Sequence, residues 1–383
     1  MTRTRPFSAS TWADDLHTVE HAVAAATAQL GSEPPALLLL FPDAALPAHE
    51  TLDRAAAAAP GVPLAGMVSE GVITRAGVRT GGCGVMAFCA ETTVGIGVAR
   101  DASYDLHAAG QAAAARAVDG LDLRPGHAVM LVFVDPTSGD EAAAIDGAYA
   151  VAGARIPLAG GGANGPDPCV IAGDMVSRDA VVAVAIASPE PVSVAIAHGC
   201  RPRPSPAIAT RTDGRALREL NGRAAEEVYL EGLGLSDPGL DDDAFERLAV
   251  LHPLGQPELR GLLRLRHVKG RAEGGGLACA TPIPPNAAVW FTDQTEDSIV
   301  ASAEVAAREA LALLPCGPRA ALVFDCAARK RAVGSRLSDE AAALVAGLGD
   351  EPAVCGLYTR GEVGRTRGAK GDRNHAVVVV AFA

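Results

Sequence analysis

The chain has 383 residues, of which 49% are hydrophobic and 20% are charged, and its formal net charge is −12. This composition supports a large buried core and excludes disorder for most of the chain. Because the chain is acidic and has no run of lysine or arginine, we expect neither nucleic acid nor an anionic membrane surface as a partner. The length predicts two or three domain-sized units.

No apolar run approaches the ~20 residues that cross a bilayer, so we expect no membrane insertion. Polar residues, among them Ser8, Ser10 and Thr11, follow the N-terminal arginines, where a signal peptide would have an apolar segment. We therefore expect a cytoplasmic protein. The eight cysteines occur singly, without CxxC pairs or zinc-finger spacing, which predicts small buried side chains and no metal site.

One arrangement of strand, helix and strand recurs along the chain. Its first copy has a strand at 37–41, an alanine-rich helix ending at 59 and a strand at 62–66. The second copy has strands at 129–134 and 156–160, and its helix begins at the capping-box spacing of Ser138 and Glu141. The third copy has a strand at 320–324, a helix at 338–348 and a strand at 351–356, and a weaker copy surrounds 251–255. Prolines 63, 157, 253 and 352 open the closing strands and lie 94, 96 and 99 residues apart.

A turn of small residues and another strand follow three of these copies, at 77–88, 176–187 and 376–382. Further helices are expected at 103–119, 213–230 and 295–314. The fold class is therefore α/β, with repeated strand-helix-strand-hairpin units that form mixed sheets covered by helices. Apolar runs without alternation, such as 377–380, indicate strands covered on both faces.

Five prolines between 189 and 206 interrupt helix and strand alike and indicate a boundary between two domains. We expect an N-terminal helical segment at 1–36, one α/β domain at 37–200 and a second at 201–383.

The segment 323–329 places polar side chains where an apolar strand ends. In α/β sheets ligands bind beyond the carboxyl ends of strands, so Asp325, Cys326 and Arg329 are candidate ligand residues. Arg329 could hold a carboxylate or phosphate and lower the pKa of the Cys326 thiol. In the alternative interpretation, Asp325 caps the turn, Cys326 is packed and Arg329 is solvated.

The segment 356–363 brackets an aromatic residue with glycines, which permit close backbone approach to a ligand. Tyr358 offers an aromatic face and Glu362 an anionic acceptor, although a tight hairpin explains the glycines equally well. The matching turns of the first two copies add Ser69, Gly161 and Asn164. No P-loop, dinucleotide-binding motif or nucleophile elbow occurs. The sequence thus indicates a binding pocket but contains no motif that is specific to one reaction.

These segments resemble the FIST family. The resemblance is carried by 324–329, 356–363 and Asn374 in the C-terminal half, and by 64–73 and 158–164 in the N-terminal half. It covers the chain from about residue 30 to the end. It implies an intracellular sensory module for small ligands such as amino acids, with Asn374 as a further candidate ligand residue. Eukaryotic relatives add an F-box, for which the region before 37 is too short.

Some bacterial FIST proteins are similar to haem-binding nitric-oxide sensors that act on histidine kinases. The resemblance therefore implies a signalling protein, such as a histidine kinase, as a partner. Haem would need a histidine ligand, and His252 and His375 lie nearest the candidate loops. No histidine aligns with a known haem ligand, since 373–375 departs from the family's pattern.

Three functions follow as alternatives. The first is a sensor that binds an amino acid or small carboxylate, with Arg329 holding the anionic group and Glu362 the cationic one. The second is a haem-based sensor. The third is an enzyme that uses Cys326 as nucleophile, with His375 and Glu362 as partners and Arg329 as the activating charge. The lack of a reaction-specific motif favours a binding protein.

Overall fold

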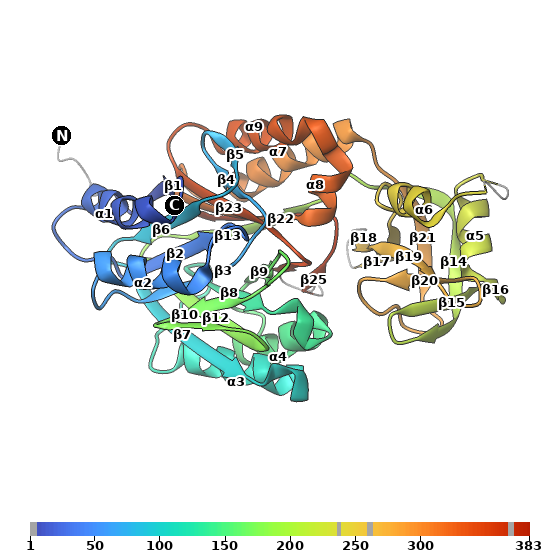
Figure 1. The fold of residues 1–383 in the computed structure, drawn as a ribbon, viewed down its shortest axis with the longest axis horizontal. Helices are drawn as coiled ribbons and strands as arrows, with labels where there is room; N and C mark the ends of the chain where they lie inside the picture. Colours follow the sequence, from blue (N-terminus) through green and yellow to red (C-terminus); the bar gives the residue numbers. More distant parts are fainter. Residues whose placement is uncertain (1–5, 236–238, 259–262, 367–370) are drawn as a thin grey trace.

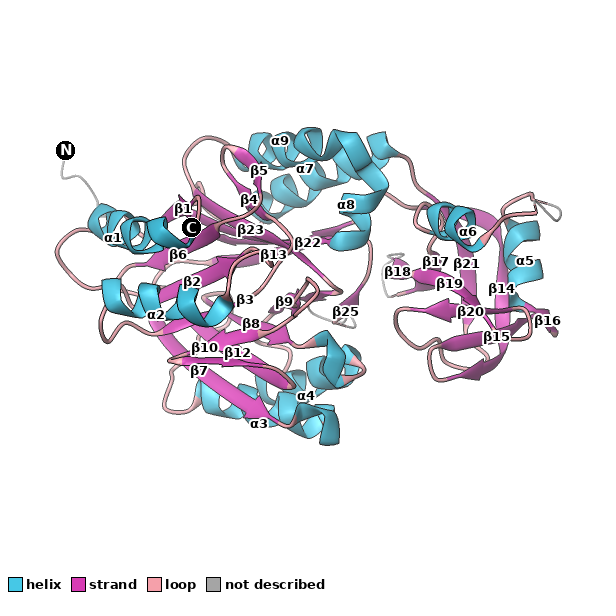
Figure 2. Ribbon diagram, in the orientation of Figure 1, coloured by secondary structure: helices cyan, strands magenta, loops and turns pink. Residues whose placement is uncertain are grey.

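The computed structural model describes residues 6–235, 239–258, 263–366 and 371–383. These residues form a large body with three six-stranded sheets and a smaller body around one eight-stranded sheet (Figure 1). Helices lie on the outer faces of the large body's sheets (Figure 2). The expected α/β class with mixed sheets covered by helices is confirmed. Among the described residues, no helix combines the length and apolar character needed to cross a membrane.

Three consecutive units repeat one order of elements in the large body, as the sequence predicts. The first unit comprises β1 (Ser8–Ala13), α1 (Val19–Leu30), β2 (Leu37–Pro42), α2 (Ala48–Ala58), β3 (Leu64–Met67), β4 (Val72–Thr74), β5 (Gly77–Arg79) and β6 (Cys83–Phe88). The second unit comprises β7 (Thr93–Arg100), α3 (Leu106–Val118), β8 (Ala128–Val134), α4 (Glu141–Ala152), β9 (Leu158–Gly162), β10 (Val170–Ala172), β11 (Met175–Ser177) and β12 (Ala180–Ala187). The third unit comprises β13 (Val192–Ala197), α7 (Glu296–Ala312), β22 (Ala320–Cys326), α8 (Ala327–Val333), α9 (Leu337–Leu348), β23 (Ala353–Thr359), β24 (Glu362–Arg365), β25 (Asp372–Arg373) and β26 (Val377–Phe382).

The three units exchange their hairpins cyclically. Each sheet has a parallel pair of strands from one unit at its centre, namely β2–β3, β8–β9 or β22–β23. An antiparallel hairpin from another unit completes the sheet. The first unit's β4–β5 joins β23, the second unit's β10–β11 joins β3, and the third unit's β24–β25 joins β9. Each sheet therefore depends on a neighbouring unit for two of its strands.

The centre of the large body is one apolar core between the three sheets. Phe41, Phe133 and Phe324 occupy matching positions in β2, β8 and β22, with ring centroids 6.3 Å and 6.2 Å apart along the row. Along β26, Val378 faces this core and Val377 faces the helices outside. The expectation that these strands are covered on both faces is thus confirmed.

The smaller body is inserted between β13 and α7 of the third unit. It comprises β14 (Arg201–Asp213), β15 (Ala216–Leu220), β16 (Arg223–Ala224), α5 (Ala225–Gly232), α6 (Asp242–Ala249), β17 (Leu254–Pro257), β18 (Leu263–Arg266), β19 (Val268–Ala272), β20 (Gly276–Cys279) and β21 (Ala288–Asp293). The weaker fourth copy expected around 251–255 is wrong, because β17 belongs to this antiparallel sheet.

Several other elements differ in detail from the expected ones. The proline-rich stretch forms β14, because its first half pairs with β21 on one side only and prolines tolerate an unpaired edge. The helix expected at 213–230 begins only at α5, since Asn221 and Gly222, both with positive φ, turn β15 into β16. The strands expected at 77–88 and 176–187 are each two strands, and 1–36 contains β1 as well as α1. Residues 1–5 lie outside the described ranges.

A buried charge cluster fixes α8 and α9 to the rest of the third unit. The Arg329 guanidinium is fully buried, with Nε 2.8 Å from Asp325 Oδ1 and Nη2 2.7 Å from Glu340 Oε1. It also donates to Ser302 Oγ and to the carbonyl oxygen of Ile299 on α7. Burial and the nearby Asp325 carboxylate raise the pKa of Glu340 to about 8. One cation thus serves two carboxyl groups, of which Glu340 holds a proton near neutral pH.

The parallel pairs allow only glycine at one position of each closing strand. Gly66 and Gly160 pair with Leu40 and Val132, and an added Cβ would lie 1.8 Å and 2.2 Å from the carbonyl oxygens of those partners. We predict that Gly66→Ala lowers the free energy of unfolding by roughly 3 kcal/mol, as in overpacked cores. Urea denaturation measures this. Gly317→Ala, where an added Cβ meets nothing within 4 Å, is the control. Equal urea midpoints for the two variants would contradict the packing described.

The proton held by Glu340 predicts that the stability of the protein depends on pH. Because the folded-state pKa of Glu340 is raised from 4.5 to about 8, the folded protein binds a proton that the unfolded chain has released in this range. We expect the free energy of unfolding to fall as pH rises between these values, by at most about 1.4 kcal/mol per pH unit. Glu340→Gln keeps an oxygen for Arg329 and should flatten this dependence. Parallel pH profiles for the two proteins in urea denaturation would show that Glu340 does not hold the proton.

Candidate functional site

A cavity of about 500 Å³ lies at the carboxyl ends of the parallel strand pairs, where the large body meets the smaller one. Cys326 ends β22 and Thr359 ends β23, while Asn164 follows β9. Arg215, His267 and Lys269 of the smaller body complete the wall. Figure 1 shows α8 and β25 facing this smaller body. The cavity therefore occupies the place that α/β sheets generally give to ligands.

The three units each present one polar side chain to this cavity from the same position. Glu70, Asn164 and Arg360 each precede a glycine with positive φ, at Gly71, Gly165 and Gly361. Asn164 Nδ2 donates to Glu70 Oε2 over 3.4 Å. The repeat thus brings a carboxylate, an amide and a guanidinium to one place.

Three of the nine candidate ligand residues line the cavity, namely Cys326, Asn164 and Asn374. The other six are packed behind the described part of its wall: Asp325, Arg329, Tyr358, Glu362, Ser69 and Gly161.

The contacts of these six are with other parts of the protein. Arg329 binds Asp325 and Glu340, as described above. Ser69 Oγ donates to the Tyr358 carbonyl oxygen and accepts from the Tyr358 N–H, which joins the first unit to the third. Gly161 packs so closely under Thr359 that an added Cβ would lie 2.6 Å from the Thr359 Cβ.

Cys326 lines the cavity, and Glu362 lies buried behind it and interacts with the Cys326 thiol. Cys326 Sγ accepts from the His375 N–H over 3.2 Å, and Glu362 Oε2 accepts from the Ala376 N–H over 3.2 Å. Burial raises the pKa of the Cys326 thiol well above its usual value, and the neighbouring Glu362 raises it further. Burial likewise raises the pKa of the Glu362 carboxyl. Because the thiolate is the nucleophilic form, this thiol is poorly activated.

No sequence motif had indicated the cations around the cavity. Arg215, Lys269, Arg331 and Arg360 line it from both bodies, and all four are exposed. Sequence patterns could not find Arg215 and Lys269, because they do not show where an inserted body sits. Arg360 lay within the glycine-flanked segment and could have been found there.

Glu141 also lines the cavity, in place of the capping role expected for it. The N-cap of α4 is Asp140, whose side chain accepts from the Ala142 N–H, and Glu141 is free to lie against Gly361. Burial raises the pKa of Glu141 to about 8, although Arg215 and Arg360 act in the opposite direction.

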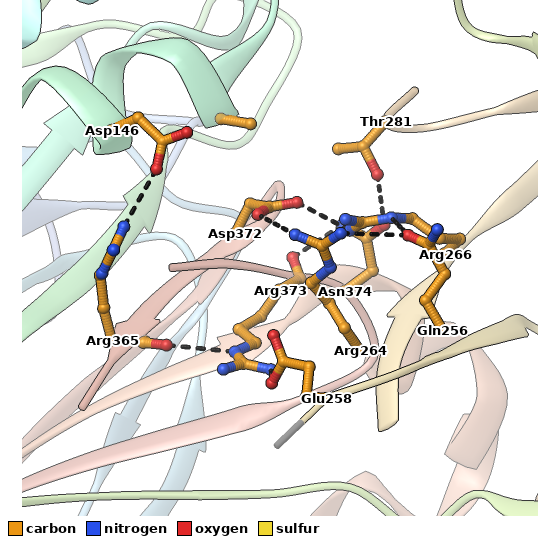
Figure 3. A network of polar contacts seen from close by, with 12 residues as sticks. Asp146, Gln256, Glu258, Arg264, Arg266, Thr281, Arg365, Asp372, Arg373 and Asn374 are labelled. Atoms are coloured by element: carbon orange, nitrogen blue, oxygen red, sulfur yellow. Dashed lines mark hydrogen bonds and ion pairs between the residues drawn. The ribbon is translucent and has the colours of Figure 1, made fainter. Parts of the chain in front are cut away.

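A polar network joins the smaller body to the third unit's hairpin beside the cavity (Figure 3). Asp372 accepts from Arg264 over 3.1 Å and from Arg266 over 2.7 Å. Arg373 of the same strand binds Glu258 over 2.7 Å. Asn374 Oδ1 accepts from the His267 N–H over 3.1 Å, and Thr281 Oγ1 lies 3.4 Å from it. Ion pairs and uncharged hydrogen bonds therefore connect the two bodies beside the cavity.

The two haem-ligand candidates lie in different places. His375 is fully buried, with Nδ1 3.2 Å from Gln294 Nε2 and Nε2 2.9 Å from His267 Nδ1. His252 has Nδ1 3.0 Å from the Thr292 carbonyl oxygen. Haem ligation stays a prediction, and at His375 it would require one of these hydrogen bonds to break. Among the described residues, no group of three or more His, Cys, Asp or Glu side chains is placed to hold a metal ion.

Comparisons with solved structures gave matches that include two cyanuric acid hydrolases. One, from A. caulinodans, is 11% identical, with coverage of 98% of this chain and 99% of that chain and a TM-score of 0.36. The other, described as an evolutionary innovation by structural concatenation, is 12% identical, with coverage of 99% and 100% and a TM-score of 0.33. These scores are too low to support an inference about this chain. No curated protein matches the sequence.

Two domain families match the sequence in consecutive segments. The FIST N domain matches residues 36–223, and the FIST C domain matches residues 225–365. The segments quoted above for the resemblance lie within these ranges or, for Asn374, shortly after them. The chain belongs to the FIST family.

Proposed function

We propose that this protein is a cytoplasmic sensor that binds an amino acid or a small carboxylate in the cavity between its two bodies. FIST domains are associated with small-ligand sensing in signalling. The observation that carries the proposal is the convergence of four cationic side chains, from both bodies, on one polar cavity of about 500 Å³. This volume is within the range of ~300–1,000 Å³ usual for small-molecule sites.

The charges around the cavity suit a ligand with both an anionic and a cationic group. Arg360 of the large body and Lys269 of the smaller body line the cavity, and in this proposal they bind the carboxylate. The exposed Glu70 carboxylate and the Asn164 side chain beside it offer acceptors to an ammonium group. Arg329 and Glu362, for which the sequence predicted these roles, are buried and bind other protein groups.

A ligand held this way touches both bodies, and this is how binding would become a signal. Without the ligand, the two bodies are joined by contacts such as the ion pairs at Asp372. Binding would add contacts that run through the ligand from one body to the other. A signalling protein, such as a histidine kinase, would detect the new relation of the two bodies.

Ligand binding is tested by thermal-shift screening of amino acids and small carboxylates. We expect at least one compound to raise the melting temperature of the wild type. Arg360→Ala should lower the affinity for that compound by about tenfold or more, because a hydrogen bond to a charged group is lost. Arg124→Ala removes a guanidinium from an exposed site outside the cavity and should bind as the wild type does. A wild type that responds to no compound would refute the proposal.

Thiol reactivity separates the sensor from the cysteine-dependent enzyme. The exposed Cys316 should react with iodoacetamide first, and Cys326 should react slowly because its raised pKa keeps it protonated. Mass spectrometry of the folded protein at neutral pH measures both rates. If Cys326 reacted faster than Cys316, and Glu362→Gln changed that rate, the enzyme would become the better interpretation.

A further inference from the structure

We propose that His267 presents a fixed N–H group to the cavity and forms, with Lys269 and Arg331, a subsite for an oxyanion of a carboxylate or phosphate. The inference rests on the proposed function, because it takes the cavity as the ligand site. It adds which atoms bind the anion and which residues orient them.

The direction of the hydrogen bonds is set at Gln294. Its Nε2 lies 2.8 Å from the Val250 carbonyl oxygen, which can only accept, so this atom is the amide nitrogen. Its Oε1 accepts from the Cys200 thiol over 3.0 Å, which agrees with that orientation. The same Nε2 lies 3.2 Å from His375 Nδ1, so Nδ1 must accept. A neutral His375 therefore carries its proton on Nε2.

The chain of bonds continues into the smaller body. His375 Nε2–H donates to His267 Nδ1 over 2.9 Å, so a neutral His267 also carries its proton on Nε2. No protein group in the described residues binds this nitrogen, and His267 lines the cavity. Burial, with Lys269 and Arg331 nearby, lowers the pKa of His267 to about 4, which keeps the ring neutral near pH 7.

Donors dominate the surroundings of this N–H group. The Lys269 ammonium and the Arg331 guanidinium are donors without acceptor capacity, and both interact electrostatically with His267. Glu246 also lines this place, and Asp243 and Arg247 line the adjoining hollow, so one positive charge remains in excess. The subsite residues and Glu246 line this second hollow of about 260 Å³ as well, so the subsite lies where the two spaces meet. An oxyanion satisfies all three donors at once.

A second group of charges lies on the other side of Lys269. Glu141 interacts electrostatically with Arg215, Arg360 and Lys269. Lys269 is thus common to both groups, and a ligand with two anionic ends could use both. Succinate and inorganic phosphate are therefore suitable probes, since one has two carboxylates and the other has a single compact centre.

The experiment is nitrogen NMR of protein with ¹⁵N-labelled histidine at pH 7.5, with resonances assigned from His267→Asn and His375→Asn. We expect both rings in the Nε2–H form, and a shift of the His267 Nε2 resonance when succinate or phosphate is added. A response to phosphate alone would assign the subsite to phosphate, and a response to succinate alone would assign it to carboxylates. An Nδ1–H form of His267, or no shift with either anion, would overturn the proposal.

Gln294→Glu tests the positioning role without touching the cavity. A carboxyl group at this place can accept from His375 Nδ1, which reverses the chain and leaves a lone pair on His267 Nε2 facing the anion. We expect the anion to bind about tenfold more weakly, whereas the exposed Gln111→Glu should change nothing. If Gln294→Glu does not fold, His267→Phe removes the same donor and should show the same loss. Unchanged affinity in the folded variants would refute the subsite.

The two proposals fail in different ways. If an amino acid or carboxylate binds the wild type but the His267 resonances do not move, the subsite is wrong and the sensor proposal survives. If nothing binds, the proposed function fails, and the form of the His267 ring still tests the hydrogen-bond chain.

Discussion

The exchange of hairpins among the three units is the constraint on which the rest of the structure depends. A unit that gives its hairpin away needs a neighbour's hairpin to complete its own sheet, so the three parallel strand pairs must close around one core. Phe41, Phe133 and Phe324 meet there because their strands share this arrangement. The carboxyl ends of the pairs then converge, and Glu70, Asn164 and Arg360 reach one cavity without any of them being near another in sequence.

The sequence allowed the three units to be predicted, because unbroken apolar runs depend on local geometry alone. The even proline spacing was misleading at Pro253, which precedes β17 in the inserted body. The sequence did not allow the exchange to be predicted, since β4–β5 has the same pattern whichever strand it joins. The site was harder still. Arg329 and Cys326 are both polar side chains near a strand end, yet the Arg329 side chain meets Asp325 and Glu340 while Cys326 reaches the cavity. Which way a side chain points there depends on α9, some ten residues further along the chain.

The surroundings of each charged side chain decide whether it stabilises the fold or is available to a ligand. Arg329 is fully buried, and removing a partner would leave an uncompensated charge in the core, so its role is in the fold. The cavity cations keep their contact with water, and pairs between exposed charges contribute little to stability. Four of them at one cavity are therefore poorly explained by stability. An anion bound among them would interact with several cations at once.

The smaller body brings its own cations close to those of the large body. Arg215 and Lys269 approach Arg331 and Arg360 across the cavity, and like charges on two bodies oppose their approach. The ion pairs at Asp372 and the bond between His267 and Asn374 act in the other direction. An anion between the cations removes the repulsion and leaves these attractive contacts unopposed. The ligand's charge, more than its shape, would then decide how closely the two bodies are held, which is what a sensor needs in order to report binding beyond the site itself.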